Sequence, residues 1–222
     1  MGKMIELTAS DGHKLAAYRA DPAAKPRGAI VVIQEIFGVN SHIKSVADGY
    51  AADGYLAIAP ALFDRVKTGV DLGYAPDDMA KGRDIRGKLT NDMAVKDVAA
   101  AVKAASVAGK VGVVGYCWGG LITWLASAQV PGLVCAVPYY GGGMPDQVSV
   151  QPKVPVMGHF GEKDAHIPVE GVKKLAAAHP RHQFFIYSAD HGFNCDQRGS
   201  YNAPAAKQAR ERTLEFFRKH VG

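Results

Sequence analysis

The sequence is poor in cysteine and has no long apolar run, and each absence excludes a class of protein. Its 222 residues include three cysteines, Cys117, Cys135 and Cys195, and no C-x-x-C pair. An odd number of widely spaced thiols argues against a disulfide framework. No apolar stretch approaches the roughly 20 residues that a membrane-spanning helix requires. The first residues also lack the apolar segment of a signal peptide. We therefore expect a cytoplasmic protein with no membrane partner.

A long basic run is also absent, although the formal net charge is +5. The densest basic stretch, residues 81–88, is interrupted by Asp84. Without a basic stripe or a known motif we expect no nucleic-acid partner. A solvated helix face explains this stretch, and a patch that recruits anionic substrates is the alternative.

The apolar residues that are present fall into short runs. The run at residues 29–34 is rich in Val and Ile, as is typical of a strand buried on both faces. Further apolar runs predict strands at residues 55–59, 111–115, 133–139, 154–160 and 183–187. Helical periodicity and end signals predict helices at residues 41–52, 91–107, 119–128, 168–178 and 203–220. An N-terminal hairpin is expected around Asp11-Gly12, and residues 62–90 are expected to be rich in loops.

This alternation predicts an α/β fold in which helices cover both faces of a mostly parallel central sheet. No internal repeat or linker divides residues 1–222, so we expect a single domain. In such sheets the chemistry lies beyond the carboxyl ends of the strands, and the segments after each strand are therefore the places to look for a site.

One strand end carries the pattern of a nucleophile turn. The segment GYCWGG at residues 115–120 lies between a predicted strand and a predicted helix, and it matches G-x-S-x-G with cysteine in place of serine. The glycines allow a sharp turn, and the N-terminus of the following helix favours a thiolate. We predict that Cys117 is a nucleophile; a small buried cysteine in a glycine-rich turn is the simpler alternative.

Two further strand ends supply an acid and a base in the chain order that this type of site requires. Asp164 follows the strand that ends at residue 160, and His191 follows the last strand. We predict that His191 acts as the general base and that Asp164 orients its ring. Glu162, on the same loop as Asp164, and Asp190, next to the histidine, are weaker candidates for the acid.

The loop at residues 34–38 follows an earlier strand and completes the predicted site. An oxyanion hole needs two donors, for which we predict the backbone N–H groups of Trp118 and Ile36. Glu35 ends an apolar strand, where an unpaired carboxylate is costly. Either a nearby arginine or backbone amides satisfy this carboxylate, or it exchanges a proton or a hydrogen bond with Cys117.

Neither a metal nor another cofactor is expected, because no H-x-x-x-H motif or Cys/His cluster is visible. The other histidines are expected to be surface or hydrogen-bonded structural residues, with His159 in an apolar strand as a candidate for a second layer behind the site. Cys135 is predicted to lie in the core. Cys195 is either an ordinary loop thiol or a thiol with a substrate-pocket or redox-sensitive role.

Several of these segments together resemble the dienelactone hydrolases (carboxymethylenebutenolidases) over nearly the whole chain. They are QEIFGVN at residues 34–40, GYCWGG at 115–120, Asp164 and HGF at 191–193. The resemblance implies a single-domain α/β-hydrolase without a large lid, which converts dienelactone to maleylacetate in the breakdown of chlorinated aromatics. It also implies a Cys–His–Asp triad and arginines that bind a substrate carboxylate. In that family the thiol is inactive until substrate displaces the glutamate that matches Glu35, which then takes the thiol proton.

The sequence departs from this family in its arginines. The arginine expected four residues after the histidine is Cys195 here, and Arg198 is the candidate substitute, while Arg83 lies near the second arginine position. Phe37 and Tyr139 are further candidate substrate contacts, although core packing explains Tyr139 equally well.

These observations favour a monomeric carboxylic ester hydrolase that acts on a small lactone or ester bearing a carboxylate, with dienelactone as the leading substrate. A carboxylesterase of broader specificity from an unrelated pathway is the first alternative. The second alternative is a protein of a different class, which uses Cys117 and Cys195 as redox-sensing thiols and hydrolyses nothing.

Overall fold

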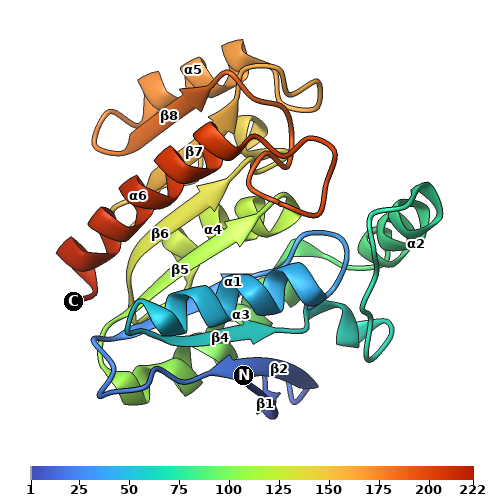
Figure 1. The fold of residues 1–222 in the computed structure, drawn as a ribbon, viewed down its shortest axis with the longest axis vertical. Helices are drawn as coiled ribbons and strands as arrows, with labels where there is room; N and C mark the ends of the chain where they lie inside the picture. Colours follow the sequence, from blue (N-terminus) through green and yellow to red (C-terminus); the bar gives the residue numbers. More distant parts are fainter. Residues whose placement is uncertain (1) are drawn as a thin grey trace.

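A computed structural model describes residues 2–222 and places eight strands in one sheet, in the order β1-β2-β4-β3-β5-β6-β7-β8 (Figure 1). Strands β3 to β8 pair in parallel, whereas β2 runs antiparallel to β1 and β4. The strands are β1 (Lys3–Thr8), β2 (Lys14–Ala20), β3 (Ala29–Ile33), β4 (Leu56–Pro60), β5 (Val111–Tyr116), β6 (Leu133–Tyr139), β7 (Met157–Gly161) and β8 (Gln183–Tyr187).

Six α-helices and three short 3-10 segments lie within the described residues. The α-helices are α1 (Ser41–Ala52), α2 (Pro76–Gly87), α3 (Asn91–Ala105), α4 (Trp118–Gln129), α5 (Val169–Ala178) and α6 (Ala203–His220). The 3-10 segments are η1 (Leu62–Arg65), η2 (Ser106–Ala108) and η3 (Met144–Gln147). Within residues 2–222, none of the helices is both long enough and apolar enough to cross a membrane.

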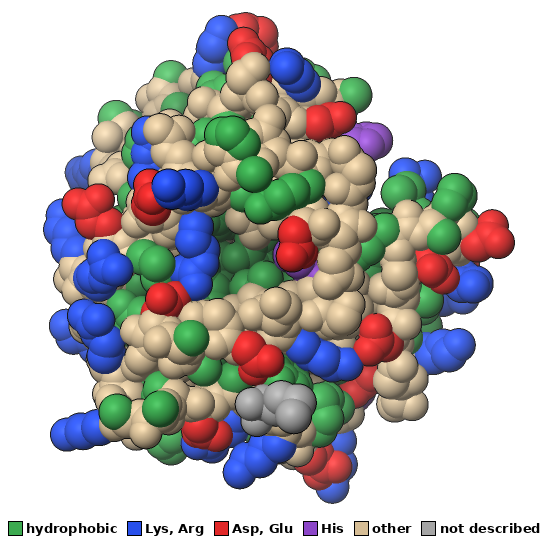
Figure 2. Space-filling view, viewed as in Figure 1, with side chains coloured by type: hydrophobic (Ala, Val, Ile, Leu, Met, Phe, Trp, Pro, Cys, Tyr) green, Lys and Arg blue, Asp and Glu red, His purple; other side chains and the backbone are tan. Residues whose placement is uncertain are grey.

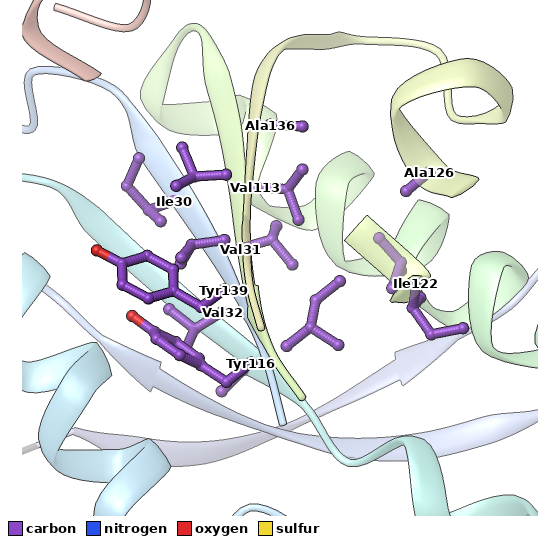
Figure 3. Packing of buried hydrophobic residues seen from close by; sticks show 14 of the residues in the cluster. Ile30, Val31, Val32, Val113, Tyr116, Ile122, Ala126, Ala136 and Tyr139 are labelled. Atoms are coloured by element: carbon purple, nitrogen blue, oxygen red, sulfur yellow. The ribbon is translucent and has the colours of Figure 1, made fainter. Parts of the chain in front are cut away.

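Helices cover both faces of the sheet, which confirms the predicted α/β fold. Figure 1 shows α1 and α6 in front of the sheet and α3 and α4 behind it, and Figure 2 shows a hollow between α1 and α6 in the same view. Strands β3, β4 and β5 are buried along their whole length, as expected for apolar runs with helices on both sides. In Figure 3, Ile122 and Ala126 of α4 lie on one side of the sheet, and Tyr116 and Tyr139 lie on the other.

Residues 62–90 were expected to be rich in loops, with a solvated helix face at residues 81–88, and the structure shows a longer helix there, because residues 76–87 form α2. This helix is polar and buries few side chains, so no apolar periodicity marks it in the sequence. Pro76 opens the helix at a position where its missing N–H costs nothing. A Cβ atom on Gly82 would clash with the carbonyl oxygen of Ile36, so α2 packs directly against the loop after β3.

The parallel strands bring the predicted site residues to one edge of the sheet. Glu35 follows β3, Cys117 follows β5, Asp164 follows β7 and His191 follows β8. Because these strands are parallel, their carboxyl ends share an edge, and α2 projects beside it (Figure 1). The fold therefore places these segments, distant in sequence, where their side chains can meet.

Candidate active site

The turn at Cys117 has the strained geometry of a nucleophile elbow. β5 ends and α4 begins directly on either side of Cys117, whose φ of 56° and ψ of −120° lie where residues with side chains are rare. Cβ atoms on Gly115 and Gly119 would clash with backbone oxygens of neighbouring segments, so only glycine allows this close approach. The thiol is thus held at the sheet edge beside the N-terminus of α4.

Asp164 orients the ring of His191. The ring Nδ1 lies 2.7 Å from Asp164 Oδ2, and the other carboxylate oxygen accepts the backbone N–H of His166 at 2.8 Å. Burial favours the neutral acid, but the hydrogen bond and the charge of His191 outweigh burial and hold the pKa of Asp164 below its usual value. Asp190 accepts the backbone N–H of His191 at 2.6 Å, so it fixes the loop rather than the ring.

Asp164 and Cys117 together determine the protonation of His191. Burial of the ring disfavours its charged form, yet the hydrogen bond to Asp164 and the interactions with the Cys117 sulfur outweigh burial. They raise the pKa of His191 to about 10. A charged imidazole ring at this position is placed to stabilise negative charge that develops on the neighbouring sulfur.

The Cys117 and His191 side chains line a cavity of about 210 Å³. Its lining residues are Ile36, Phe37, Met79, Arg83, Cys117, Gly142, His166, His191 and Arg198. The structure thus brings the predicted nucleophile and base together with all of the predicted substrate contacts except Tyr139.

Tyr139 does not line the cavity, and its assignment as a substrate contact is wrong. The ring is fully buried beside Tyr116 (Figure 3), and its hydroxyl lies 2.7 Å from the hydroxyl of Thr213 on α6. The last side chain of β6 therefore points into the layer between the sheet and α6. The next residue, Tyr140, is the one whose ring meets His191, with 5.2 Å between the ring centroids.

Glu35 is fully buried and is paired with a neighbouring cation. Arg198 Nη1 donates to one carboxylate oxygen at 3.2 Å, and the Tyr74 hydroxyl donates to the other at 3.2 Å. Burial, and then the charge of Glu35, raise the pKa of Tyr74 above its usual value, so its hydroxyl keeps its proton. Of the two interpretations of Glu35, the structure shows the one in which an arginine forms an ion pair with its carboxylate. Within residues 2–222 no hydrogen bond joins Glu35 to Cys117.

The two predicted arginines differ in whether a carboxylate of the protein already pairs with them. Arg198 pairs with Glu35, and its guanidinium carbon lies 5.8 Å from the ring centroids of both Phe37 and Tyr74. Arg83, on α2, lines the same cavity, and no carboxylate of residues 2–222 forms an ion pair with it. Arg83 is therefore the cation that is free to meet an anionic substrate.

The two predicted oxyanion-hole donors have no other partner. Within residues 2–222 the backbone N–H groups of Ile36 and Trp118 donate to no backbone or side-chain acceptor. Ile36 lines the cavity, and Trp118 directly follows Cys117 at the start of α4. Unsatisfied N–H groups beside a nucleophile are what an oxyanion hole requires.

The other two cysteines lie outside the cavity. Cys135 is fully buried in β6, where burial raises its pKa, and its predicted place in the core is confirmed. Cys195 is also fully buried, and burial together with the charge of Glu35 raises its pKa to about 11. Cys195 is therefore a buried loop thiol beside Glu35, and it does not line the cavity.

Several residues around the site could not be identified from motifs. Met79 belongs to α2, Gly142 and His166 lie on loops without a recognisable pattern, and Tyr74 precedes α2. A signal for the start of α2 was present, because Pro76 is followed by two acidic residues, as is typical of helix N-termini. Placing that helix would have placed Met79 and Arg83 beside the site.

Comparisons of the sequence and of the structure with known proteins find the same family. The family model described as the dienelactone hydrolase family matches residues 15–221. A carboxymethylenebutenolidase of Pseudomonas putida is 35% identical and covers 96% of this chain and 94% of its own. A Synechocystis protein provisionally named a carboxymethylenebutenolidase is 34% identical and covers 94% of this chain and 93% of its own. The crystal structure of a Klebsiella pneumoniae protein, provisionally named a dienelactone hydrolase, matches with a TM-score of 0.85 at 31% identity, over 98% of this chain and 100% of the other.

Proposed function

The chain belongs to the dienelactone hydrolase family, and we propose that it hydrolyses a small lactone or ester through a covalent intermediate on Cys117. One observation carries the proposal: Cys117, on a strained turn, shares a cavity with His191, whose ring is hydrogen-bonded to Asp164. A nucleophile, a base and a group that orients the base are the elements of covalent acyl transfer.

The reaction would begin with attack of the Cys117 sulfur on the carbonyl carbon, which forms a C–S bond. The N–H groups of Ile36 and Trp118 would hold the negative charge on the oxygen. When the C–O bond breaks, His191 would give its proton to the leaving oxygen, which in a lactone stays attached to the acyl group. Neutral His191 would then take a proton from water, whose hydroxide would attack the thioester and release Cys117 as a thiolate.

Glu35 would couple this chemistry to substrate binding. Its partner Arg198 lines the cavity, so a substrate carboxylate competes with Glu35 for the same guanidinium. A Glu35 carboxylate released in this way is a base near the site and would accept the proton of a neutral Cys117 thiol. A buried carboxylate that has lost its cation is costly to keep charged, which favours its uptake of a proton.

The cavity favours a small substrate that bears a carboxylate. Its volume of about 210 Å³ suits a compact molecule, and Arg83 and Arg198 both line it. Conversion of dienelactone to maleylacetate is the reaction we propose first, because that substrate is a small lactone with a carboxylate. The name of the Pseudomonas putida relative supports the same choice.

A panel of lactones and activated esters, assayed with wild-type protein and with Cys117→Ala, tests the nucleophile. Cys117→Ala should lower kcat/KM by at least about 10⁴-fold, because loss of a nucleophile removes the covalent path. Cys135→Ala removes a buried thiol of the core and is the matched control, which should keep its turnover per folded molecule. Retained turnover in Cys117→Ala would overturn the proposal. Rapid peroxide consumption with no hydrolysis of any panel member would favour the redox-sensing alternative.

The same panel tests carboxylate recognition through Arg83. Arg83→Ala should raise KM about tenfold for esters with a carboxylate and leave KM for neutral esters of equal size nearly unchanged, since only the charged esters lose an ion pair. An equal rise for both classes would contradict direct recognition. Efficient turnover of neutral esters alone would favour an esterase of broader specificity.

The proposal also includes a monomer of one domain, residues 1–222, that works in the cytoplasm without nucleic acid. Three free cysteines suit a reducing compartment. Gel filtration with light scattering at assay concentrations measures the oligomeric state, and a mass near twice 23.6 kDa would contradict a monomer.

A further inference from the structure

We propose that Glu35, His42 and Cys195 form a binding site for a divalent transition-metal ion of the zinc class. One possible ligand atom from each residue lies within 4.8 Å of the other two, and all three residues are buried. Glu35 follows β3, His42 belongs to the first turn of α1, and Cys195 lies in the loop before α6. The fold alone brings them together, which is why no motif marks the site in the sequence.

His42 supplies the observation that points to a ligand. It is 3% exposed, and its Nε2 is buried with no hydrogen-bond partner within residues 2–222. A buried polar atom without a partner costs roughly 1–3 kcal/mol, so a bound ligand would remove a real penalty. The other ring nitrogen, Nδ1, lies 3.3 Å from Asp196 Oδ1. A carboxylate on the opposite nitrogen is the usual partner of a metal-binding imidazole, because it fixes the tautomer that leaves Nε2 free.

The donor set indicates the kind of ion. One sulfur, one imidazole nitrogen and one carboxylate oxygen match Zn²⁺ or Co²⁺, whereas Mg²⁺ and Ca²⁺ prefer oxygen alone. Tetrahedral Zn²⁺ with bonds of about 2.0–2.3 Å sets its ligand atoms roughly 3.5 Å apart. The three side chains must therefore close by on the order of 1 Å on binding, and water would take the fourth position.

His42 lies at the wall of a surface hollow. The hollow, of about 310 Å³, lies between α1 and α6 (Figure 2). Both His42 and Asp196 line it. Two basic residues also line this hollow, and both have acidic partners: Arg210 pairs with Asp53, and Lys207 approaches a glutamate one turn along α6. Their pairing reduces the repulsion that an entering cation would meet.

Metal binding would also affect hydrolysis, and this consequence rests on the proposed function. Glu35 cannot serve both an ion and its present partners, Arg198 and Tyr74. An ion held by Glu35 would keep that carboxylate from accepting the thiol proton of Cys117. The site is therefore expected to be inhibitory, acting from outside the cavity that holds the nucleophile.

Binding is tested in a Cys117→Ala background, so that the nucleophile contributes no ligand and activity plays no part in the readout. Titration with Co²⁺ alone should give thiolate-to-cobalt absorption in the near ultraviolet and tetrahedral bands in the visible, saturating at one ion per chain. Added Zn²⁺ should abolish both. In the same background Cys195→Ser should remove the near-ultraviolet band, and Cys135→Ala should leave it unchanged.

Two imidazole variants sharpen the binding test. His42→Gln should weaken Co²⁺ binding by at least about 100-fold, since loss of an outer partner alone costs 10–100-fold. Asp196→Asn, which removes that outer partner, should weaken binding within the 10–100-fold range. Circular dichroism and thermal melts of the metal-free variants establish that each is folded. No near-ultraviolet band in the Cys117→Ala protein, or one that persists in folded Cys195→Ser and His42→Gln, would overturn the site.

A separate assay tests inhibition in protein that retains Cys117. Zn²⁺ should inhibit wild-type hydrolysis, and His42→Gln should need at least about tenfold more Zn²⁺ for the same fractional loss, each protein being compared with its own metal-free rate. Equal sensitivity of the two proteins would place the inhibitory ion elsewhere and would contradict regulation through this site. Because the cobalt titration uses an inactive protein, failure of the hydrolase proposal leaves its result interpretable.

Discussion

His159 and His191 lie near β7 and β8, the first fully buried and the second largely buried at the cavity wall, yet their surroundings give them opposite charge states. His159 is fully buried in β7, with Nδ1 2.8 Å from the Tyr187 hydroxyl and Nε2 3.1 Å from the Thr213 hydroxyl. Burial, and then the charge of Arg212, lower the pKa of His159 to about 3. His191 is held by a carboxylate and a sulfur instead, and its pKa is raised to about 10.

The difference shows that burial alone does not decide the chemistry of an imidazole. Both ring nitrogens of His159 form hydrogen bonds with uncharged hydroxyl groups, so the ring stays neutral. These hydrogen bonds connect β7 with β8 and α6. Asp164 stabilises the charged form of His191, and the cavity leaves its ring open to a substrate. A buried histidine thus becomes a candidate proton carrier only where an anion accompanies it.

The largest expected effect is the difference in kcat/KM between variants of the two histidines. His191→Gln should lower kcat/KM for an activated ester on the order of 10⁵–10⁶-fold, as expected when a general base acting with a nucleophile is lost. His159→Gln should change kcat/KM per folded molecule by less than about tenfold, because glutamine can still bond to the two hydroxyls. Steady-state kinetics, normalised to the folded fraction from circular dichroism, measure both. Similar losses in the two variants would break the comparison.

Removing the anion should make His191 more like His159. Asp164→Asn keeps the shape of the side chain, and it should lower kcat by about 10⁴-fold, because the ring loses both its tautomer control and its charge partner. NMR titration of the ring should show the pKa of His191 falling from about 10 toward or below the ordinary value near 6.5.

The matched control for this substitution is Asp190→Asn. Asp190 contacts only the backbone N–H of His191, so kcat and the His191 pKa should change little. An unchanged His191 pKa in Asp164→Asn would contradict a positioning role for Asp164, even if activity were lost.

Much of the fold could be predicted, because burial leaves a periodic mark on the sequence. The runs that became β3, β5 and β6 are buried along nearly their whole length, and their composition reflects it. The helix at residues 76–87 was anticipated only as a solvated helix face at residues 81–88, and its bounds were not, because a polar helix with little buried surface carries no such pattern. Its position is set instead by tertiary packing against the loop after β3.

The site residues also fall into those that the sequence predicted and those that it did not. Cys117, Asp164 and His191 could be placed because each follows a strand in a parallel sheet, so local pattern and topology determine their edge. An arginine partner for Glu35 was foreseen as one of two alternatives, but Arg198 was predicted as a substrate contact and not as that partner. The nearness of His42 to Cys195 was not foreseen at all, because it depends on how α1 and the loop before α6 pack.

The smallest expected effect concerns stability, and it gives the two histidines opposite pH windows. The folded-state pKa of His159 is about 3, below the unfolded value near 6.5. Its contribution to the free energy of unfolding is thus present above pH 6.5 and is lost as the pH falls, by about 1.4 kcal/mol per unit. The folded-state pKa of His191 is about 10, so its contribution is complete below pH 6.5 and is lost as the pH rises toward 10.

Urea unfolding at pH 5, 7 and 9 measures the free energy of unfolding against pH. Compared with wild type, the free energy should depend less on pH on the acid side in His159→Gln and less on the alkaline side in His191→Gln. Parallel curves for all three proteins would mean that neither ring changes its proton affinity on folding, and the comparison would fail.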